Sequence, residues 1–450
     1  MAIKRFYATA DNTITNTSRF DDKSPATNAN MGLSDSLEVF YIENEVSGDP
    51  EEARIIIKFD QSEIVNDYVT GSYTNSKYYL KLFNAVHPYT LPKNFDVQVY
   101  SLDTDFDEGN GLDMEDYLDL GYSNWLSASS TVAWNTTGSD VGTLLGSANF
   151  SDGTEDLTVD VTAAVTSSSP NLKFVIKMPA SDENQYTKKF FARGSQFYFS
   201  RPTIELHHDD YVEEQGDEVY RYTNRLDSAD NTNTLFFYNY SNGVLKDLPS
   251  TDVGIRFYED EEKTTSMFSA SAGKISTGKY SASFSEATLT GSYDCIYGEW
   301  YNTSSLVSYE DKTYEVLDRD NTIDSDYVCN ITNLKKEYGT QEVPKLSVFF
   351  RKKGEQHNVY TVMQKKAESL KISNVFYKIT RIEDDLEVIP YTHKDSQATR
   401  LSYDATGNFF RLNMSLFEAG YMYKINLARK VGDVLQELPE SFKFRVTYCR

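Results

Sequence analysis

Acidic side chains at alternate positions are the first candidates for chemistry in this 450-residue chain. Asp103, Asp105 and Asp107 have the spacing of carboxylate ligands in a calcium-binding loop. The glycine, Gly109, falls one place later than such a loop requires, and Met114 stands where a glutamate should bind through both oxygens. A solvated acidic loop fits this segment better than a cation site, and we predict no metal ligand here.

A pair of histidines beside two aspartates is the second candidate. His207 and His208 precede Asp209 and Asp210, and both residue types bind transition metals. The sequence shows no third ligand, and the run lies where a domain ends. We therefore expect a solvated pair rather than a metal site.

Motifs for catalysis are missing from the sequence. The chain has no Gly-x-Ser-x-Gly nucleophile turn and no glycine-rich phosphate loop ending in Lys-Ser or Lys-Thr. Paired carboxylates for glycoside cleavage stay open, because an acidic chain offers many pairs and only geometry selects among them. We expect no catalytic residue, no cofactor-binding residue and no enzyme activity. The histidines occupy no recognisable context, and they are His87, His207, His208, His357 and His393.

Aromatic side chains offer a surface for stacking on sugar rings. The candidates are Trp125, Trp134, Tyr198 and Trp300. In a β-protein such residues more often pack in the core, and that reading is favoured here.

The elements that position these residues are expected to be β-strands. Tyrosine and phenylalanine are abundant, and Asp, Asn, Ser, Thr and Gly punctuate short apolar runs, which is typical of all-β proteins. Only residues 61–68 look helical. Strands are expected at 10–16, 36–42, 54–60, 77–83, 95–100, 155–165, 172–178, 189–194 and 201–206.

Domain boundaries follow from where the strand pattern stops. The strands of residues 155–206 would close a β-sandwich, and residues 209–218 are polar and acidic, as in a linker. At roughly 100–200 residues per domain, three domains fit the length. We place them at 1–208, 209–340 and 341–450.

Charge is distributed unevenly along the chain. The formal net charge is −24, which disfavours nucleic acid as a partner because phosphate binding needs a basic face. Residues 341–450 hold 18 basic and 13 acidic side chains, or +5, which leaves −29 for residues 1–340. Basic runs at 351–353 (Arg351, Lys352, Lys353) and 365–366 could seat the C-terminal module on an acidic partner, or could simply be solvated strand ends.

Cysteine content and apolar runs indicate the cellular compartment in which the chain folds. Cys295, Cys329 and Cys449 are an odd number at no metal-like spacing, so we expect reduced thiols with no structural role. The start lacks a long apolar stretch, and no run approaches 18 apolar residues. We therefore expect neither a signal peptide nor a membrane partner.

Several segments of the first domain resemble a known family. They are residues 10–14 (Ala-Asp-Asn-Thr-Ile), 57–60, 106–109, 157–165 and 201–206, and together they are similar to a DNRLRE-type domain. The resemblance covers about residues 8–208 and implies a jelly-roll β-sandwich related to carbohydrate-binding modules. The chain departs from the family at 192–195, which reads Ala-Arg-Gly-Ser, so no sugar site is carried over.

An internal repeat marks the rest of the chain. Gly278 is followed 13 residues later by Gly291, and Gly407 by Gly420 at the same spacing, with an isoleucine five residues past each second glycine. This pattern predicts two immunoglobulin-like sandwiches. The last one also resembles C-terminal modules of bacteriophage virion proteins, in residues 387–391, 399–402 and 404–410.

Two functions remain after these observations. The leading expectation is a structural component of a tailed-bacteriophage virion, located at the neck, collar, tail or capsid surface and assembled in the host cytoplasm. Its partners would be other virion proteins and further copies of itself in a symmetric assembly. The alternative is a carbohydrate-binding adhesin that contacts a host glycan.

Overall fold

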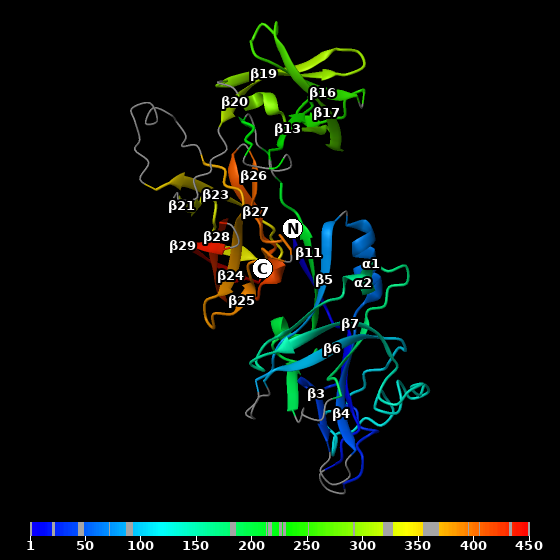
Figure 1. Cartoon of the computed structure of the whole chain (residues 1–450). Helices are drawn as coiled ribbons and strands as arrows, with labels where there is room; N and C mark the ends of the chain where they lie inside the picture. Colours follow the sequence, from blue (N-terminus) through cyan, green and yellow to red (C-terminus); the bar gives the residue numbers. More distant parts are fainter. Residues whose placement is uncertain are drawn as a thin grey trace. The chain divides into compact units, whose positions relative to one another are not determined.

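The computed structural model shows an almost entirely β-structured chain built from successive modules (Figure 1). It divides into two compact units, unit 1 with Met1–Asp210 and Lys394–Ala398, and unit 2 with Tyr211–His393 and Thr399–Arg450. The all-β prediction is confirmed. The structure describes residues 2–19, 23–43, 49–71, 73–86, 93–180, 186–212, 214, 218–224, 227, 231–250, 252–290, 293–317, 327–353, 369–394, 396–404, 406–431 and 434–448.

Unit 1 is built from two sheets that share one core. The smaller sheet has the order β1-β11-β5-β8, and the larger has the order β10-β3-β4-β9-β6-β7, with β2 paired to β4. Their bounds are β1 Ile3–Tyr7, β2 Ala10–Thr15, β3 Ser36–Glu43, β4 Pro50–Lys58, β5 Thr74–Leu82, β6 Phe95–Leu102, β7 Val141–Phe150, β8 Leu157–Asp160, β9 Lys173–Lys177, β10 Tyr186–Phe191 and β11 Thr203–Asp209.

The larger sheet is buried on both faces around β4. Ile55 and Ile57 point into the core between the sheets, whereas Ile56 packs on the opposite face. There Ile56 meets Phe106, Trp125 and other side chains of the long segment between β6 and β7. A continuous apolar run is what a strand needs when both of its faces are covered. The irregular segment 103–140 is therefore fixed to the sheet by a second core.

Two short helices belong to unit 1. Helix α1, Gln61–Thr70, begins where the carboxylate of Asp60 accepts hydrogen bonds from the backbone N–H groups of Ser62 and Glu63, and the helix predicted there is confirmed. Residues 155–165 do not form one strand as expected. The strand β8 ends at Asp160, whose side chain accepts the N–H of Thr162 at 2.9 Å, and helix α2, Thr162–Thr166, follows.

The middle module consists of one continuous sheet of seven strands that encloses its own core. The order is β12-β20-β19-β16-β17-β18-β13, and Trp300 and Tyr280 are among its buried side chains. The bounds are β12 Glu218–Tyr220, β13 Asn233–Tyr238, β16 Val253–Tyr258, β17 Ser266–Ser276, β18 Lys279–Phe284, β19 Cys295–Asn302 and β20 Ser308–Leu317, with the small hairpin β14 Tyr240–Ser241 and β15 Val244–Leu245 beside them.

The C-terminal module has two sheets. Their orders are β21-β23-β27-β26 and β22-β29-β28-β24-β25, and the rings of Tyr377 and Phe410 stack across them with centroids 4.5 Å apart. The bounds are β21 Tyr327–Ile331, β22 Glu337–Gly339, β23 Lys345–Lys352, β24 Val375–Arg381, β25 Glu387–Ile389, β26 Ser402–Asp404, β27 Gly407–Arg411, β28 Met422–Val431 and β29 Val434–Thr447.

A tyrosine near the start of β28 fixes the turn before it. The hydroxyl of Tyr423 donates to the carbonyl of Glu418 and accepts the N–H of the same residue, both at 2.9 Å. This arrangement is the tyrosine corner of immunoglobulin-like sandwiches.

The internal repeat predicted from the sequence corresponds to a strand, a short 3-10 helix and a second strand in both modules. The first glycine of each repeat has a positive φ, +69° at Gly278 and +119° at Gly407. Gly291 lies outside the described residues.

Strand pairing places the last module boundary earlier in the chain than the sequence suggested. Strand β21 pairs with β23, and β22 pairs with β29, so residues 327–339 contribute to the C-terminal sheets. The boundary expected between 340 and 341 assigned them to the middle module. Short strands such as Glu337–Gly339 carry too little pattern to reveal which sheet they join.

Strands near the two ends of each module pair with one another in different directions. In the middle module β12 runs parallel to β20, and in the C-terminal module β22 runs parallel to β29. In unit 1 the first strand, β1, is antiparallel to β11, so Ile3 lies opposite His207.

Candidate functional site

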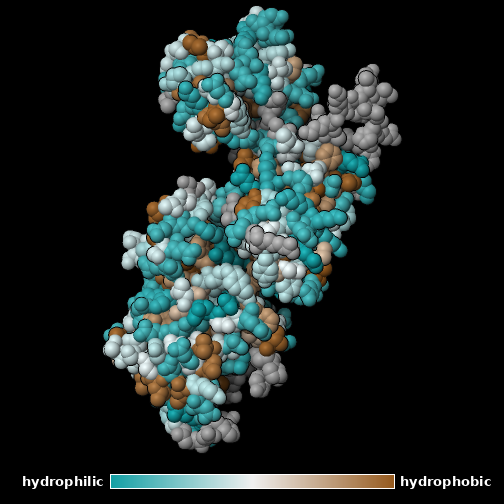
Figure 2. Space-filling view, turned by 180° about the vertical axis from the view of Figure 1, so that it is seen from behind, coloured by the Kyte–Doolittle hydropathy of each residue, from teal (hydrophilic) through white to brown (hydrophobic). Residues whose placement is uncertain are grey.

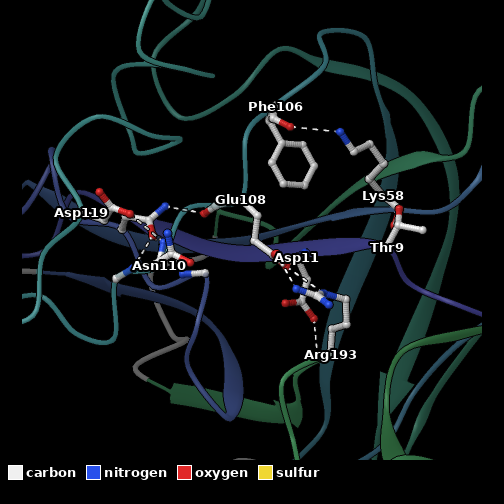
Figure 3. A network of polar contacts seen from close by, with 11 residues as sticks. Thr9, Asp11, Lys58, Phe106, Glu108, Asn110, Asp119 and Arg193 are labelled. Carbon is white, nitrogen blue, oxygen red and sulfur yellow. Dashed lines mark hydrogen bonds and ion pairs between the residues drawn. The ribbon is translucent and has the colours of Figure 1, made fainter.

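A partly buried polar network, centred on the fully buried Asp11, links three segments of unit 1 that are far apart in the sequence (Figure 3). The guanidinium of Arg193 donates to both carboxylate oxygens of Glu108, from Nε at 2.9 Å and from Nη2 at 2.5 Å. Glu108 also accepts the backbone N–H of Asp11 at 2.8 Å, and Asp11 accepts the backbone N–H of Arg193 at 2.6 Å. The three residues close a ring of hydrogen bonds.

Amide side chains extend this network into the long segment between β6 and β7. Asn12 donates to the carbonyl and hydroxyl of Ser123, at 3.0 and 2.9 Å. Asn30 donates to the carbonyls of Glu108 and Ser123 and accepts the N–H of Gly111. Because these groups are buried, each bond satisfies backbone that would otherwise lack a partner.

Burial gives Asp11 an unusual proton affinity. Desolvation raises its pKa from 3.8 to about 7, the nearby charge of Glu108 adds to this effect, and the hydrogen bond from Arg193 opposes it. A raised pKa in a cleft would suggest general acid or base catalysis. Here, however, the carboxyl is 1% exposed, and the Arg193 fork is occupied by Glu108. The arrangement is suited to holding the long segment in place.

The expected acidic loop does not gather its carboxylates. Asp105 forms an ion pair with Lys58 at 3.0 Å, Phe106 points into the second core, and Glu108 faces Arg193. Within the described part of the chain, no group of three His, Cys, Asp or Glu residues is placed to hold a metal ion. The residues singled out at 103–107, with Gly109 and Met114, serve the loop's own structure.

The histidine pair is placed differently from the prediction. His207 and His208 belong to β11 and are 6% and 7% exposed, so the expected solvated pair is wrong. The ring of His207 contacts Glu205 through Nε2 at 2.6 Å and Ser396 through Nδ1 at 2.9 Å. The sequence missed this because the neighbours that bury the ring come from distant segments.

Glu205 is the centre of a second charged cluster. Its carboxylate lies 2.7 Å from the guanidinium of Arg5 and 2.7 Å from the ammonium of Lys81, besides the contact with His207. Burial alone would raise its pKa, but Lys81, Arg5 and His207 together hold the pKa well below its ordinary value of 4.5. A carboxylate with three cationic or hydrogen-bonding neighbours stays ionised.

Of the four candidate stacking residues, three are buried. Trp125 and Trp134 pack in the second core of unit 1, and Trp300 lies in the core of the middle module, where its Nε1 donates to Tyr314. Tyr198 is the exception, since it is 44% exposed and its ring lies 4.5 Å from that of Tyr7. Only Tyr198 is available to a sugar.

The remaining candidates, apart from His87, belong to unit 2. Cys295 and Cys329 are both free thiols, and Cys449 lies outside the described residues. Of the basic runs, 351–353 ends β23 and follows it, whereas 365–366 lies outside the described part. His87 and His357 are likewise outside it.

The network around Arg193 was not predicted as a site. Its members nevertheless fall in segments quoted for the family resemblance, residues 10–14 and 106–109, and in the departing segment 192–195. The signal was a set of polar residues inside β-patterned segments, where a charge must find a partner. The sequence could not show that these three segments meet.

No family profile and no curated protein matches the chain. Solved structures that align with it include the fibronectin(III)-like modules of Clostridium thermocellum CbhA, with 13% identity, 53% of this chain, 93% of that chain and a TM-score of 0.16. The FN1–FN3 domains of chicken CNTN1 align with 10% identity over 88% of this chain and 94% of that chain, with a TM-score of 0.19. At such TM-scores neither alignment supports a shared activity.

One further property concerns membranes. Among the described residues, no helix has the length and apolar character needed to cross a bilayer.

Proposed function

We propose that this chain is a non-enzymatic structural component of a tailed-bacteriophage particle that acts through protein–protein contacts. The observation that carries the proposal is how the chain uses its buried charge. Glu108 is tied to Arg193, and Glu205 to Arg5 and Lys81, within unit 1. These carboxylates stabilise long-range contacts of the fold and would have to lose their partners before meeting a substrate.

The C-terminal module supports the same proposal. The segments that resemble virion modules, 387–391, 399–402 and 404–410, contribute the strands β25, β26 and β27. They therefore belong to the folded body of the module rather than to a tail. The proposed partners are other virion proteins and further copies of this chain, and the proposed location is the neck, collar, tail or capsid surface.

Analysis of purified particles tests this proposal. Mass spectrometry of particles made in the presence and absence of the chain would show whether it is incorporated at a fixed copy number. Cryo-electron microscopy would then place it on a symmetry axis or ring. Abundant chain in the host lysate together with complete, infectious particles that lack it would overturn the proposal.

Glycan binding is the second candidate, favoured by one surface of unit 1. Phe197 and Tyr198 are 55% and 44% exposed, and the Arg201 guanidinium lies 5.3 Å from the Tyr198 ring centroid. Exposed aromatic rings beside a cation suit a sugar face and its hydroxyls. Binding of the full chain to host surface polysaccharide should be lost with Phe197→Ala plus Tyr198→Ala and kept with Tyr448→Ala, an exposed control.

A further inference from the structure

The segment between β6 and β7 exposes apolar side chains that a solitary domain would normally cover. Tyr117 and Leu120 are 63% and 60% exposed, and Leu112 and Tyr122 are 44% and 38% exposed. On the face of unit 1 drawn in Figure 2, brown apolar side chains lie in groups among teal ones. Clustered exposed apolar residues mark interaction surfaces, and tyrosine is enriched among residues that dominate binding energy.

The same segment is strongly negative. Residues 103–122 contain eight carboxylates and no lysine or arginine. Asp107 and Asp116 are exposed beside the apolar side chains. Asp105 and Glu108 are already paired with Lys58 and Arg193, and Arg19 donates to the carbonyl of Met114. The exposed carboxylates Asp107 and Asp116 still leave the segment negative, so a protein that covers its apolar residues is expected to present cations around an apolar centre.

The segment is already held in shape before any partner arrives. The carboxylate of Asp113 accepts three successive backbone N–H groups, from Glu115, Asp116 and Tyr117. Leu112 donates its N–H to the carbonyl of Tyr117 at 2.8 Å. The ring of Asp11, Glu108 and Arg193 fixes its base. A pre-ordered surface loses less conformational entropy on binding.

A complementary surface exists on the C-terminal module of the same chain. In the β28–β29 pair, Met422 lies opposite Arg445 and Lys424 opposite Lys443. Opposite residues of antiparallel strands share a face, and the alternate residues Tyr423 and Phe444 are buried, so these four point outward. Met422 is 41% exposed, and Lys443 and Arg445 are exposed too.

This cationic face carries a local cost that a negative partner would remove. Lys424 and Lys443 stand directly opposite one another, and like charges in that position are destabilising. Two carboxylates compensate in part: Asp385 lies 3.4 Å from Lys424 with 82% of its own side chain exposed, and Glu337, exposed on β22, is paired in register with Arg445. A carboxylate-rich surface seated here would relieve the repulsion and cover Met422.

We propose that the apolar, acid-rimmed loop of residues 103–122 in one copy of the chain binds the cationic β28–β29 face of a second copy. The contact joins different surfaces, so it is head-to-tail and generates rings or filaments rather than closed two-fold dimers. It deepens the proposed function by naming a partner, and it rests on that function only for placing the contact inside a particle. Association of the purified full chain tests the contact alone.

Sedimentation of the full chain over a range of concentrations is the first test. Self-association is expected at low ionic strength and should weaken at physiological salt, where the Debye length is about 8 Å. Asp107→Lys with Asp116→Lys should raise the dissociation constant about tenfold or more. The control, Glu261→Lys with Glu262→Lys, makes the same charge change at exposed positions of the middle module and should leave association unchanged.

Charge exchange makes the test specific to these two surfaces. Lys443→Glu with Arg445→Glu should weaken association to a similar extent, and a chain that carries these two substitutions together with Asp107→Lys and Asp116→Lys should associate again. Carbodiimide cross-linking of mixed light and heavy-isotope chains should join carboxylates of 103–122 to Lys443 or Lys424 between copies. Circular dichroism and melting confirm that each variant is folded.

Three outcomes overturn the proposal. The full chain could remain monomeric at every concentration and salt, the control could weaken association as much as the loop variant, or the exchanged chain could fail to associate while folded. None of these results bears on whether the chain is found in particles, which the mass spectrometry described above measures separately.

Discussion

Two carboxylates in unit 1, those of Glu205 and Asp11, are almost fully buried, and their environments shift their pKa values in opposite directions. Glu205 has Arg5, Lys81 and His207 within 2.7 Å, and its pKa falls well below the ordinary value. Asp11 receives one backbone N–H at that distance, and burial raises its pKa to about 7. Burial costs both groups a similar solvation energy, so the number of close cations decides whether the charge survives.

The two sites also differ in what they join. Glu205 connects neighbouring strands of one sheet, since β1 and β5 both pair with β11. Asp11 and Arg193 join strand β2 to a turn and to an irregular segment. The first cluster reinforces contacts that the backbone already makes, whereas the second supplies contacts that no strand pairing provides.

Glu205→Ala should produce the largest effect, because it leaves Arg5 and Lys81 buried without their counter-charge. Removing one partner of a buried ion pair costs about 3–5 kcal/mol. Urea unfolding measures this change in the free energy of unfolding. Asp105→Asn, which removes a carboxylate that is 68% exposed, is the control and should change stability by less than about 1 kcal/mol. Equal effects would show that the Glu205 cluster is no stronger than a surface pair.

Arg193→Met should come next, at about 2–3 kcal/mol, since Glu108 loses both of its side-chain donors. Hydrogen exchange should quicken in residues 107–111 while the strands β5 and β11 stay protected. Arg193→Lys keeps the positive charge but loses the two-point hydrogen bonding of the guanidinium, so its stability should lie between those of wild type and Arg193→Met. Loss of protection throughout unit 1 would mean that the network supports the whole sandwich rather than the loop.

Asp11→Asn should have a smaller effect that depends on pH. With a pKa of about 7 when folded and 3.8 when unfolded, Asp11 contributes stability that is fully present below pH 4 and is lost as pH rises to 7. The variant should therefore match wild type near pH 4 and exceed it at pH 8, by at most about 4 kcal/mol, the ceiling that the pKa difference sets. A wild-type advantage at pH 8 would show that Asp11 is ionised and favourable in the fold.

Cys329 extends the comparison to a buried thiol whose charged neighbour is an anion, Glu440. Burial, followed by the charge of Glu440, raises its pKa to about 12, so it remains a thiol at neutral pH. We expect iodoacetamide at pH 8 to spare it in the folded protein and to modify Cys295, which is partly exposed. Reducing agent should leave the melting temperature unchanged. A drop of several degrees would indicate that a disulfide forms in solution.

The sequence predicted strands well where the apolar pattern was strong. The run at 54–60 and the alternation at 95–100 became β4 and β6, and Asp60 marked the start of α1. Strand β7 was missed because Val141–Phe150 is rich in Gly, Ser and Thr, which also form loops. Two sites were missed for another reason. Glu108 and Arg193 are 85 residues apart, and Arg5 and Glu205 are 200 apart, so only tertiary structure pairs them.

The direction of the terminal strands determines how each module would respond to tension. Where β12 runs parallel to β20, and β22 to β29, the start of the earlier strand and the end of the later strand lie at opposite ends of the pair. A pull on both ends then shears all the hydrogen bonds between the terminal strands at once. In unit 1 β1 is antiparallel to β11, so a pull between Ile3 and His207 would break the hydrogen bonds between these two strands one after another. We therefore expect the paired strands of the two modules of unit 2 to resist a stretching force better than the β1–β11 pair of unit 1.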